Sequence, residues 1–233
     1  MINSFIQISD CHIDDQKLVR KINTQANLSL IINDLTLKSF NALIISGDLT
    51  ENGTLVSYEI IKKIIAPIDV SFSVLPGNHD DDLHFPIIFN KNYLKSLSID
   101  NWEIITLNST QKNKVGGFLS DEQLQLLSEK ILSLNNKFII LCLHHPPVSM
   151  ESEWNDELSL ENTADFFNVV DQFKNIKAII WGHAHECKEF NRKGLKLFSC
   201  PSSAWQFNDC DMIGYNHYHL SVEGEIYCET VWL

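Results

Sequence analysis

The chain has 233 residues, of which 44% are hydrophobic and 21% charged, as expected of a globular protein large enough for a substantial core. Its 18 basic residues stand against 30 acidic ones, so the formal charge is −12. This balance argues against a broad face for duplex nucleic acid, which needs lysine and arginine to replace phosphate counterions. An anionic substrate would need a local positive centre, and a metal ion is one source of it, because arginine occurs only at Arg20 and Arg192.

Six cysteines are scattered along the chain without any CxxC pair. This spacing favours free thiols in a reducing compartment over a disulfide framework. The first residues show no basic segment followed by a long apolar stretch, and no apolar run approaches the roughly 18 residues of a membrane span. We therefore expect a cytoplasmic protein without a membrane partner, in which residues 1–233 form one domain.

β-prone runs and helix-like stretches alternate from the N-terminus to Trp181. The β-prone runs are residues 5–9, 42–46, 70–76, 138–143 and 178–181, and the helical patterns are residues 24–40, 57–68, 120–134 and 161–173. Interleaved strands and helices predict an α/β fold with substantial parallel pairing. Beyond Trp181, residues 195–200, 218–222 and 225–233 are expected to form antiparallel strands that complete a sheet.

Each of the five β-prone runs is followed at its carboxyl end by residues that can bind a metal. These residues are Asp10 and His12, Asp48, the run Asn78-His79-Asp80, the pair His144-His145, and the pair His183 and His185. One aspartate after a strand is usually a cap or a turn residue, and one histidine is usually a core residue. Five such coincidences together favour a shared site, because ligands of open α/β sheets gather at the carboxyl ends of strands.

Alternation along an extended strand adds detail to two of these segments. Asp10 and His12 should project from one side of the chain and Cys11 from the other, so Cys11 is expected in the core. By the same argument His145 points away from His144, which favours a structural or supporting role for His145 over metal binding.

With His79 and His145 set aside, the candidate ligands are seven, three with oxygen donors and four with imidazole: Asp10, His12, Asp48, Asn78, His144, His183 and His185. That mixture suits manganese, iron or zinc and disfavours calcium, which takes oxygen almost exclusively. Seven ligands exceed the needs of one catalytic zinc but suit two ions that share a carboxylate. Two ions about 3.5–4 Å apart can hold a bridging hydroxide and clamp an in-line phosphoryl displacement. The set therefore indicates phosphoester hydrolysis.

The order Asp-x-His, Gly-Asp, Gly-Asn-His-Asp, His, Gly-His-x-His resembles that of the calcineurin-like metallophosphoesterases, in five blocks that span the chain from residue 5 onward. The resemblance implies an α/β fold, a four-layer αββα sandwich of two mixed sheets flanked by helices. The resemblance also implies the metal ligands: Asp10, His12 and His185 for a first metal, Asn78, His144 and His183 for a second, and Asp48 bridging both. It further implies that His79 contacts the phosphate and assists the leaving oxygen, and that Asp80 orients His79.

Three segments narrow the resemblance to bacterial class III cyclic nucleotide phosphodiesterases, namely residues 116–131, 144–166 and 200–207. Trp154, Asp156, Leu160 and Asn162 stand at matching places within the second segment. The implied reaction is hydrolysis of 3′,5′-cyclic AMP to AMP by a metal-bridging hydroxide.

Several alternatives stay open at this level. The substrate could instead be a glycerophosphodiester, a 2′,3′-cyclic nucleotide or another small phosphoester. A protein-binding module that has lost catalysis is the alternative of a different class, but none of the seven ligands is missing. The sequence does not choose among iron, manganese and zinc, decide whether the chain forms a homodimer, or tell whether Trp205 and Phe207 line a pocket or pack a core.

Overall fold

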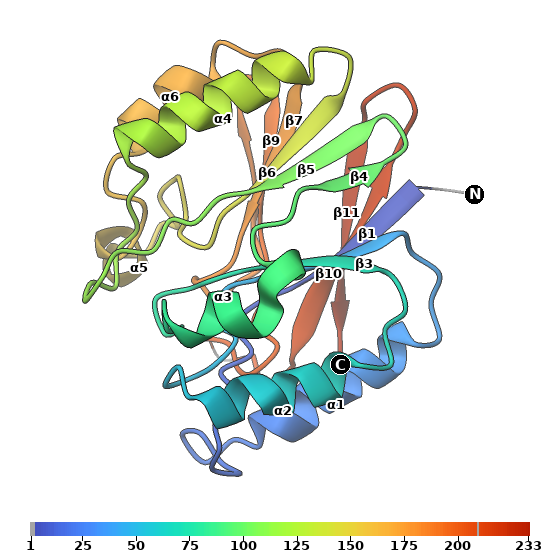
Figure 1. The fold of residues 1–233 in the computed structure, drawn as a ribbon, viewed down its shortest axis with the longest axis vertical. Coiled ribbons are helices and arrows are strands. Elements are labelled where there is room, and N and C mark those ends of the chain that lie inside the picture. The colour runs from blue at the N-terminus through green and yellow to red at the C-terminus, as the bar shows by residue number, and fades with distance from the viewer. Residues whose placement is uncertain (1–2, 209) are drawn as a thin grey trace.

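The computed structural model describes residues 3–208 and 210–233, and it shows two mixed β-sheets packed face to face between helices (Figure 1). In spatial order the first sheet contains β11 (Ile226–Trp232), β10 (Gly214–Leu220), β1 (Asn3–Ile8), β2 (Ala42–Ser46) and β3 (Ser71–Leu75). The second sheet contains β4 (Leu97–Ile99), β5 (Trp102–Thr106), β6 (Phe138–Cys142), β7 (Ile176–Trp181), β9 (Leu195–Ser199) and β8 (Glu189–Arg192).

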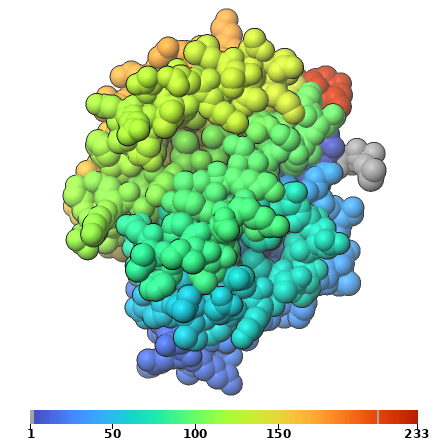
Figure 2. Space-filling view, viewed as in Figure 1, coloured from blue at the N-terminus to red at the C-terminus, as the bar shows by residue number. Residues whose placement is uncertain are grey.

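Helices form the two outer layers. On the first sheet lie α1 (Thr24–Leu35), α2 (Leu55–Ile65), α3 (His84–Phe89) and the 3₁₀ turn η1 (Asn90–Asn92). On the side of the second sheet lie α4 (Asp121–Ser133), α5 (Glu153–Glu157) and α6 (Thr163–Val170). The space-filling view shows the blue and cyan residues of α1 and α2 at one end of the molecule and the yellow-green residues of α4 at the other, with green residues of the middle of the chain between them (Figure 2). The expected four-layer αββα sandwich is thereby confirmed.

Three apolar layers hold the sandwich together. The middle layer lies between the sheets and includes Phe5, Trp102 and Tyr218. The outer layers lie between each sheet and its helices. Strands covered on both faces read as continuous apolar runs, and β2 is accordingly buried at every position. This packing fixes the carboxyl ends of the central strands, where the candidate ligands follow.

The predicted parallel pairing is confirmed, since β1, β2 and β3 run parallel in one sheet and β5, β6, β7 and β9 in the other. The antiparallel strand expected over residues 195–200 is confirmed on one side only. They form β9, which pairs parallel with β7, whereas β10 and β11 form a hairpin in the first sheet. The antiparallel partner of β9 is the strand β8, which the sequence pattern did not reveal. It turns back through Lys193 and Gly194, both at positive φ, and forms an antiparallel edge beside β9.

Helix ends follow local side chains more closely than apolar periodicity. The helix expected over residues 24–40 ends at Leu35, where Thr36 bonds the carbonyl of Asn33 through its hydroxyl. α4 begins with a capping box in which Ser120 and Gln123 each bond the other's main chain. Among the described residues no helix combines the length and the apolar character needed to cross a bilayer.

Candidate metal centre

Strand ends from both sheets meet at one edge of the sandwich. The Asp10 main-chain N–H donates to the carbonyl of Gly47, which joins the ends of β1 and β2. The Asp10 carboxylate also accepts the main-chain N–H of His183 at 3.0 Å, which joins the first sheet to the end of β7 in the second. The convergence expected from the sequence is therefore present, and it draws on two sheets.

The backbone is left-handed at most of the candidate ligands. Positive φ occurs at Asp10 (54°), His12 (45°), Asp48 (47°), His183 (64°) and His185 (47°). Such a conformation costs about 1–3 kcal/mol at a residue other than glycine, and it is concentrated in proteins at functional sites. The predicted burial of Cys11 is confirmed, but alternation along a strand does not explain it. Cys11 is buried in the core under α1 and α2, but the chain on either side of it is not an extended strand.

Asp10, His12 and His185 form the first group of donors. The Nε2 atoms of His12 and His185 lie 3.0 Å apart, and His185 Nε2 lies 3.5 Å from the Asp10 carboxylate. The opposite ring nitrogens have acceptors, because His12 Nδ1 lies 2.8 Å from Glu51 Oε2 and His185 Nδ1 lies 2.7 Å from the carbonyl of Trp205. Donation from Nδ1 leaves a lone pair on each Nε2, as a metal ligand requires. A cation held by these residues would satisfy both lone pairs.

Asn78, His144 and His183 form the second group. His144 donates from Nδ1 to the carbonyl of Ser46 at 2.8 Å, and its Nε2 lies 3.3 Å from His183 Nδ1. Asn78 Oδ1 is buried without a hydrogen-bond partner among the described residues. A buried carbonyl oxygen without a donor is costly, and a metal ion can replace the missing donor. These groups fit a bound metal.

Asp48 lies between the two groups. Its Oδ2 is 3.4 Å from His144 Nε2 and 3.8 Å from His12 Nε2, while its Oδ1 accepts the main-chain N–H of His79 at 2.9 Å. Burial alone would raise the pKa of this carboxyl, but the imidazoles of His144 and His12 outweigh burial and hold the pKa well below its usual value. The segment that carries Asn78 passes directly against Asp48, since a Cβ added to Gly77 would lie 2.1 Å from Asp48 Oδ1.

His79 is placed differently from the candidate ligands. Its side chain is 31% exposed, and its Nδ1 lies 2.9 Å from the main-chain carbonyl of Glu51. The expectation that the Asp80 carboxylate orients this ring is wrong. That carboxylate accepts hydrogen bonds from Leu49, Thr50, Tyr58 and Gly77. The Asp80 carboxylate therefore links the loops after β2 and β3 by hydrogen bonds, and the main-chain carbonyl of Glu51 orients the His79 ring.

His145 is a supporting residue, as its orientation in the sequence indicated. It is fully buried, with Nδ1 2.8 Å from Ser109 Oγ and Nε2 2.8 Å from the carbonyl of Val115. Burial first, and then the neighbouring His144, hold its pKa well below the usual value. Both ring nitrogens already have protein partners, so His145 has no free lone pair for a metal.

Cys11→Ser should leave kcat/KM within a few-fold of the wild-type value, because the side chain points into the core. Burial raises the pKa of this thiol to about 12, so the group is an inert core residue. Burying a hydroxyl among apolar side chains costs about 1–3 kcal/mol, which should lower the melting temperature by about 2–12 °C. Thermal unfolding and metal analysis check this, with the partly exposed Cys210→Ser as control. A marked loss of bound metal in Cys11→Ser would contradict the assignment.

Glu51 is a functional candidate that the motif analysis missed. Its Oε2 lies 2.8 Å from His12 Nδ1 and 3.8 Å from His79 Nδ1, so one carboxylate faces both rings. Burial would raise the pKa of this carboxyl, but His12 outweighs burial and lowers it. In the sequence, Glu51 could have been identified as a carboxylate three residues after the candidate ligand Asp48.

Glu51→Ala should weaken metal binding by about 10–100-fold, because groups that orient a ligating histidine contribute on that scale. Glu51→Gln should lose less, since an amide oxygen still accepts the Nδ1 proton of His12. Metal titration measures both effects. Glu59→Ala, on the exposed face of α2, is the matched control. Equal affinities in wild-type and Glu51→Ala proteins would remove Glu51 from the site.

Aromatic side chains cover the first group of donors. The Trp205 ring lies 4.5 Å from that of His12, and Phe207 stacks on His185 at 4.2 Å with 13° between the planes. Trp154 meets Phe207 edge to face at 5.0 Å. Trp205 and Phe207 therefore form a wall of the site, which decides the question that the sequence left open. Neither packs between the sheets.

The polar residues of the segment after β6 brace its loops. Asp156 accepts hydrogen bonds from the Ser149 hydroxyl and from the main-chain N–H of Met150, each at 2.6 Å. The Asn162 amide bonds both the N–H and the carbonyl of Leu119. Both residues fix the course of the chain around the site and do not point a free group into it.

A cavity of about 480 Å³ opens beside Asn78. Its walls are Gly77–Asn78, Asp80–Leu83 and residues 110–115, which include Lys112 and Lys114. Lys114 pairs with Glu161 at 3.2 Å. Asp80, Asp81 and Asp82 also line this cavity, so its walls carry charges of both signs.

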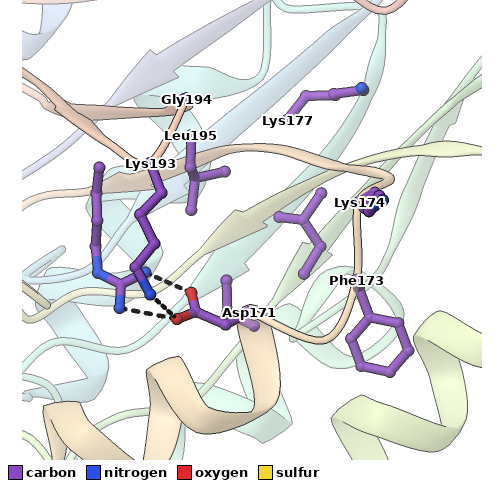
Figure 3. A pocket seen from close by; sticks show the side chains of 10 residues that line it. Asp171, Phe173, Lys174, Lys177, Lys193, Gly194 and Leu195 are labelled. Carbon is purple, nitrogen blue, oxygen red and sulfur yellow. Dashed lines mark hydrogen bonds and ion pairs between the residues drawn. The ribbon is translucent and has the colours of Figure 1, made fainter.

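A second pocket, of about 330 Å³, lies at the opposite end of β7 from His183 (Figure 3). Asp171 in this pocket pairs with Lys193 at 2.8 Å and with Arg192. The residues that line it include none of the candidate metal ligands. This pocket is therefore separate from the metal centre.

A two-sheet sandwich that gathers buried Asp, Asn and His donors at five strand ends defines a dinuclear metal-dependent hydrolase. Residues 4–187 match the family model described as calcineurin-like phosphoesterase. The chain therefore belongs to the calcineurin-like phosphoesterase family, as its motifs indicated.

Similar proteins cover all or most of the chain. A protein of Ruthia magnifica named probable cyclic nucleotide phosphodiesterase is 45% identical over 233 residues, 100% of either chain. The 3′,5′-cyclic adenosine monophosphate phosphodiesterase CpdA of Pseudomonas aeruginosa is 27% identical, over 87% of this chain and 76% of its own length. Among solved structures, a dimetal phosphatase from Danio rerio superposes with a TM-score of 0.78 at 12% identity, covering 98% of this chain and 96% of that one. The structural likeness supports the fold alone.

Proposed function

We propose that this chain hydrolyses 3′,5′-cyclic AMP to 5′-AMP with two bound metal ions. The observation that carries the proposal is the 45% identity, along the full length of both chains, to a protein named probable cyclic nucleotide phosphodiesterase. The relative in Pseudomonas aeruginosa, named for cyclic AMP, supports the choice of nucleotide. The intact set of candidate ligands favours an active enzyme over a binding module. The cytoplasmic location expected from the cysteine pattern belongs to the same proposal.

The proposal assigns the donors in two sets that share one carboxylate. The first ion takes Asp10, His12 and His185, the second takes Asn78, His144 and His183, and Asp48 serves both, with iron, manganese or zinc as the metal. When bound, such ions acidify the attacking water and neutralise charge on the phosphate. Because the donors come from both sheets, the proposal also treats residues 1–233 as one catalytic domain.

The chain's own residues then guide the substrate and the proton. The cavity beside Asn78 receives the nucleotide, and Lys112 in its wall offers a positive charge to the phosphate. A water oxygen bonds to phosphorus while the bond between phosphorus and the 3′ oxygen breaks. His79, protonated on both ring nitrogens and held at Nδ1 by the carbonyl of Glu51, gives its Nε2 proton to the departing 3′ oxygen. The attacking water releases one proton to solvent, and His79 regains one from solvent.

A panel of phosphodiesters tests the proposal. Protein reconstituted separately with manganese, iron or zinc is assayed by kcat/KM on cyclic AMP, cyclic GMP, 2′,3′-cyclic AMP, a glycerophosphodiester and an aryl diester. We expect the highest value for cyclic AMP and 5′-AMP as its only product. A higher value for a glycerophosphodiester or a 2′,3′-cyclic nucleotide would overturn the substrate assignment and keep the reaction class. No hydrolysis of any diester with any metal would overturn both.

A further inference from the structure

Three potential metal ligands lie together on the hairpin β10–β11, outside the centre described above. The ligand atoms of His217, His219 and Glu229 all lie within 4.8 Å of one another. His217 and His219 project from one face of β10, because side chains two residues apart on a strand point the same way. Glu229 is the register partner of His217 on β11, so its carboxylate projects from that face too.

The three donors are poorly satisfied within the protein. His217 Nε2 is shielded from solvent and has no hydrogen-bond partner among the described residues. His219 Nε2 lies 3.9 Å from Glu229 Oε2, which is too far for a hydrogen bond. The two imidazole rings lie 4.2 Å apart. Two imidazoles and a carboxylate that face one another without bonding are the donor set of a three-ligand zinc site.

We propose that His217, His219 and Glu229 bind a third divalent transition-metal ion such as Zn²⁺, with water completing its coordination. Metal–ligand bonds of about 2.0–2.2 Å require the donor atoms to be about 3.3 Å apart, so a small rotation of the side chains suffices. Glu229 is exposed and both imidazoles are half-buried, which leaves room for that rotation. The ion would exchange with solvent, because the site lies on the surface.

The surroundings do not oppose a cation. The nearby amine of Lys38, in the segment after α1, lies 3.5 Å from the Asp34 carboxylate, which offsets its charge. In the first sheet His217 pairs with Ile6 of β1. Ile6 belongs to the core under α1 and precedes the candidate ligand Asp10 in the chain. The proposed site is therefore separate from the dinuclear centre, and it does not depend on the proposed substrate.

Such an ion would tie β10 to β11 and stabilise the folded chain. A ligand that binds only the folded state raises stability with its concentration. At 100-fold excess over Kd we expect a rise in melting temperature of about 5–10 °C for a chain of this size.

The test uses protein whose two catalytic ions are already loaded and whose excess metal has been removed. Calorimetric titration with Zn²⁺ should show one further equivalent with a Kd below about 100 μM. The double variant His217→Ala/His219→Ala should lose this equivalent and the rise in melting temperature while keeping two ions. Glu229→Gln should weaken the binding. Glu122→Gln, an equal charge change at the exposed start of α4, should not.

Two results would overturn the proposal. One is a holoenzyme that takes up no third Zn²⁺ below about 100 μM. The other is a third equivalent that persists in the double variant. If the double variant does not fold, Glu229→Gln and Glu122→Gln decide the question, since both alter only an exposed side chain, and equal binding by the two would count against the site.

Discussion

Asp48→Asn should lower kcat/KM for cyclic AMP by more than about 10³-fold and reduce bound metal below two ions per chain. Asp48 is the carboxylate that lies between the two donor groups, with Oδ2 3.4 Å from His144 Nε2 and 3.8 Å from His12 Nε2. Asparagine keeps the size of the side chain and an oxygen for the main-chain N–H of His79 but removes the charge. Metal analysis after dialysis and steady-state kinetics at limiting metal measure the two losses.

Two further variants sharpen this test. His12→Ala removes a donor of the first group only, so it should retain about one ion and lose less activity at saturating metal. Asp165→Asn, on the exposed surface of α6, should behave as the wild-type chain does. Near-normal turnover of Asp48→Asn at low metal concentration would show that the ligand assignment is wrong.

The sequence predicted the site better than it predicted the contacts within it. Runs such as Ala42–Ser46 are apolar at nearly every position because both faces of a central strand are covered. Once such strands run parallel, whatever follows them collects at one edge, so Asp48 and His144 can be placed together without a structure. The division of these strands between two sheets could not be inferred. It depends on packing in the layer that contains Trp102 and Tyr218, which lie far apart in the chain.

The wrong and missing assignments share a physical cause. Asp80 follows His79 directly, which suggested that the two side chains interact, yet its carboxylate turns to Thr50 and Tyr58. Glu51 looked like an ordinary loop residue, yet it faces His12 and His79. Both outcomes follow from how the loops after β2 and β3 fold over each other. Positive φ at Asp48 and at other ligands turns the chain there in ways that no propensity predicts.

His79→Ala should leave two ions bound and lower kcat for cyclic AMP by about 10²–10⁴-fold, the usual contribution of a proton-transfer group. His79 lies beside His12 and Asp48, with ligand atoms of all three within 4.8 Å of one another. It differs from the donors in that its Nδ1 is 2.9 Å from the carbonyl of Glu51 and its side chain is partly exposed. Nε2 is then the ring nitrogen left to meet a substrate. Metal analysis together with kcat and KM on cyclic AMP checks the prediction.

The leaving group decides which role His79 has. The 3′ oxygen of cyclic AMP is a poor alkoxide leaving group and needs a proton, whereas the phenolate of an aryl diester leaves without one. If His79 is mainly a general acid, His79→Ala should therefore lose much less activity on the aryl diester than on cyclic AMP. Equal losses on the two substrates would assign His79 to electrostatic stabilisation of the transition state. Loss of one ion from His79→Ala would refute both roles and make His79 a metal ligand.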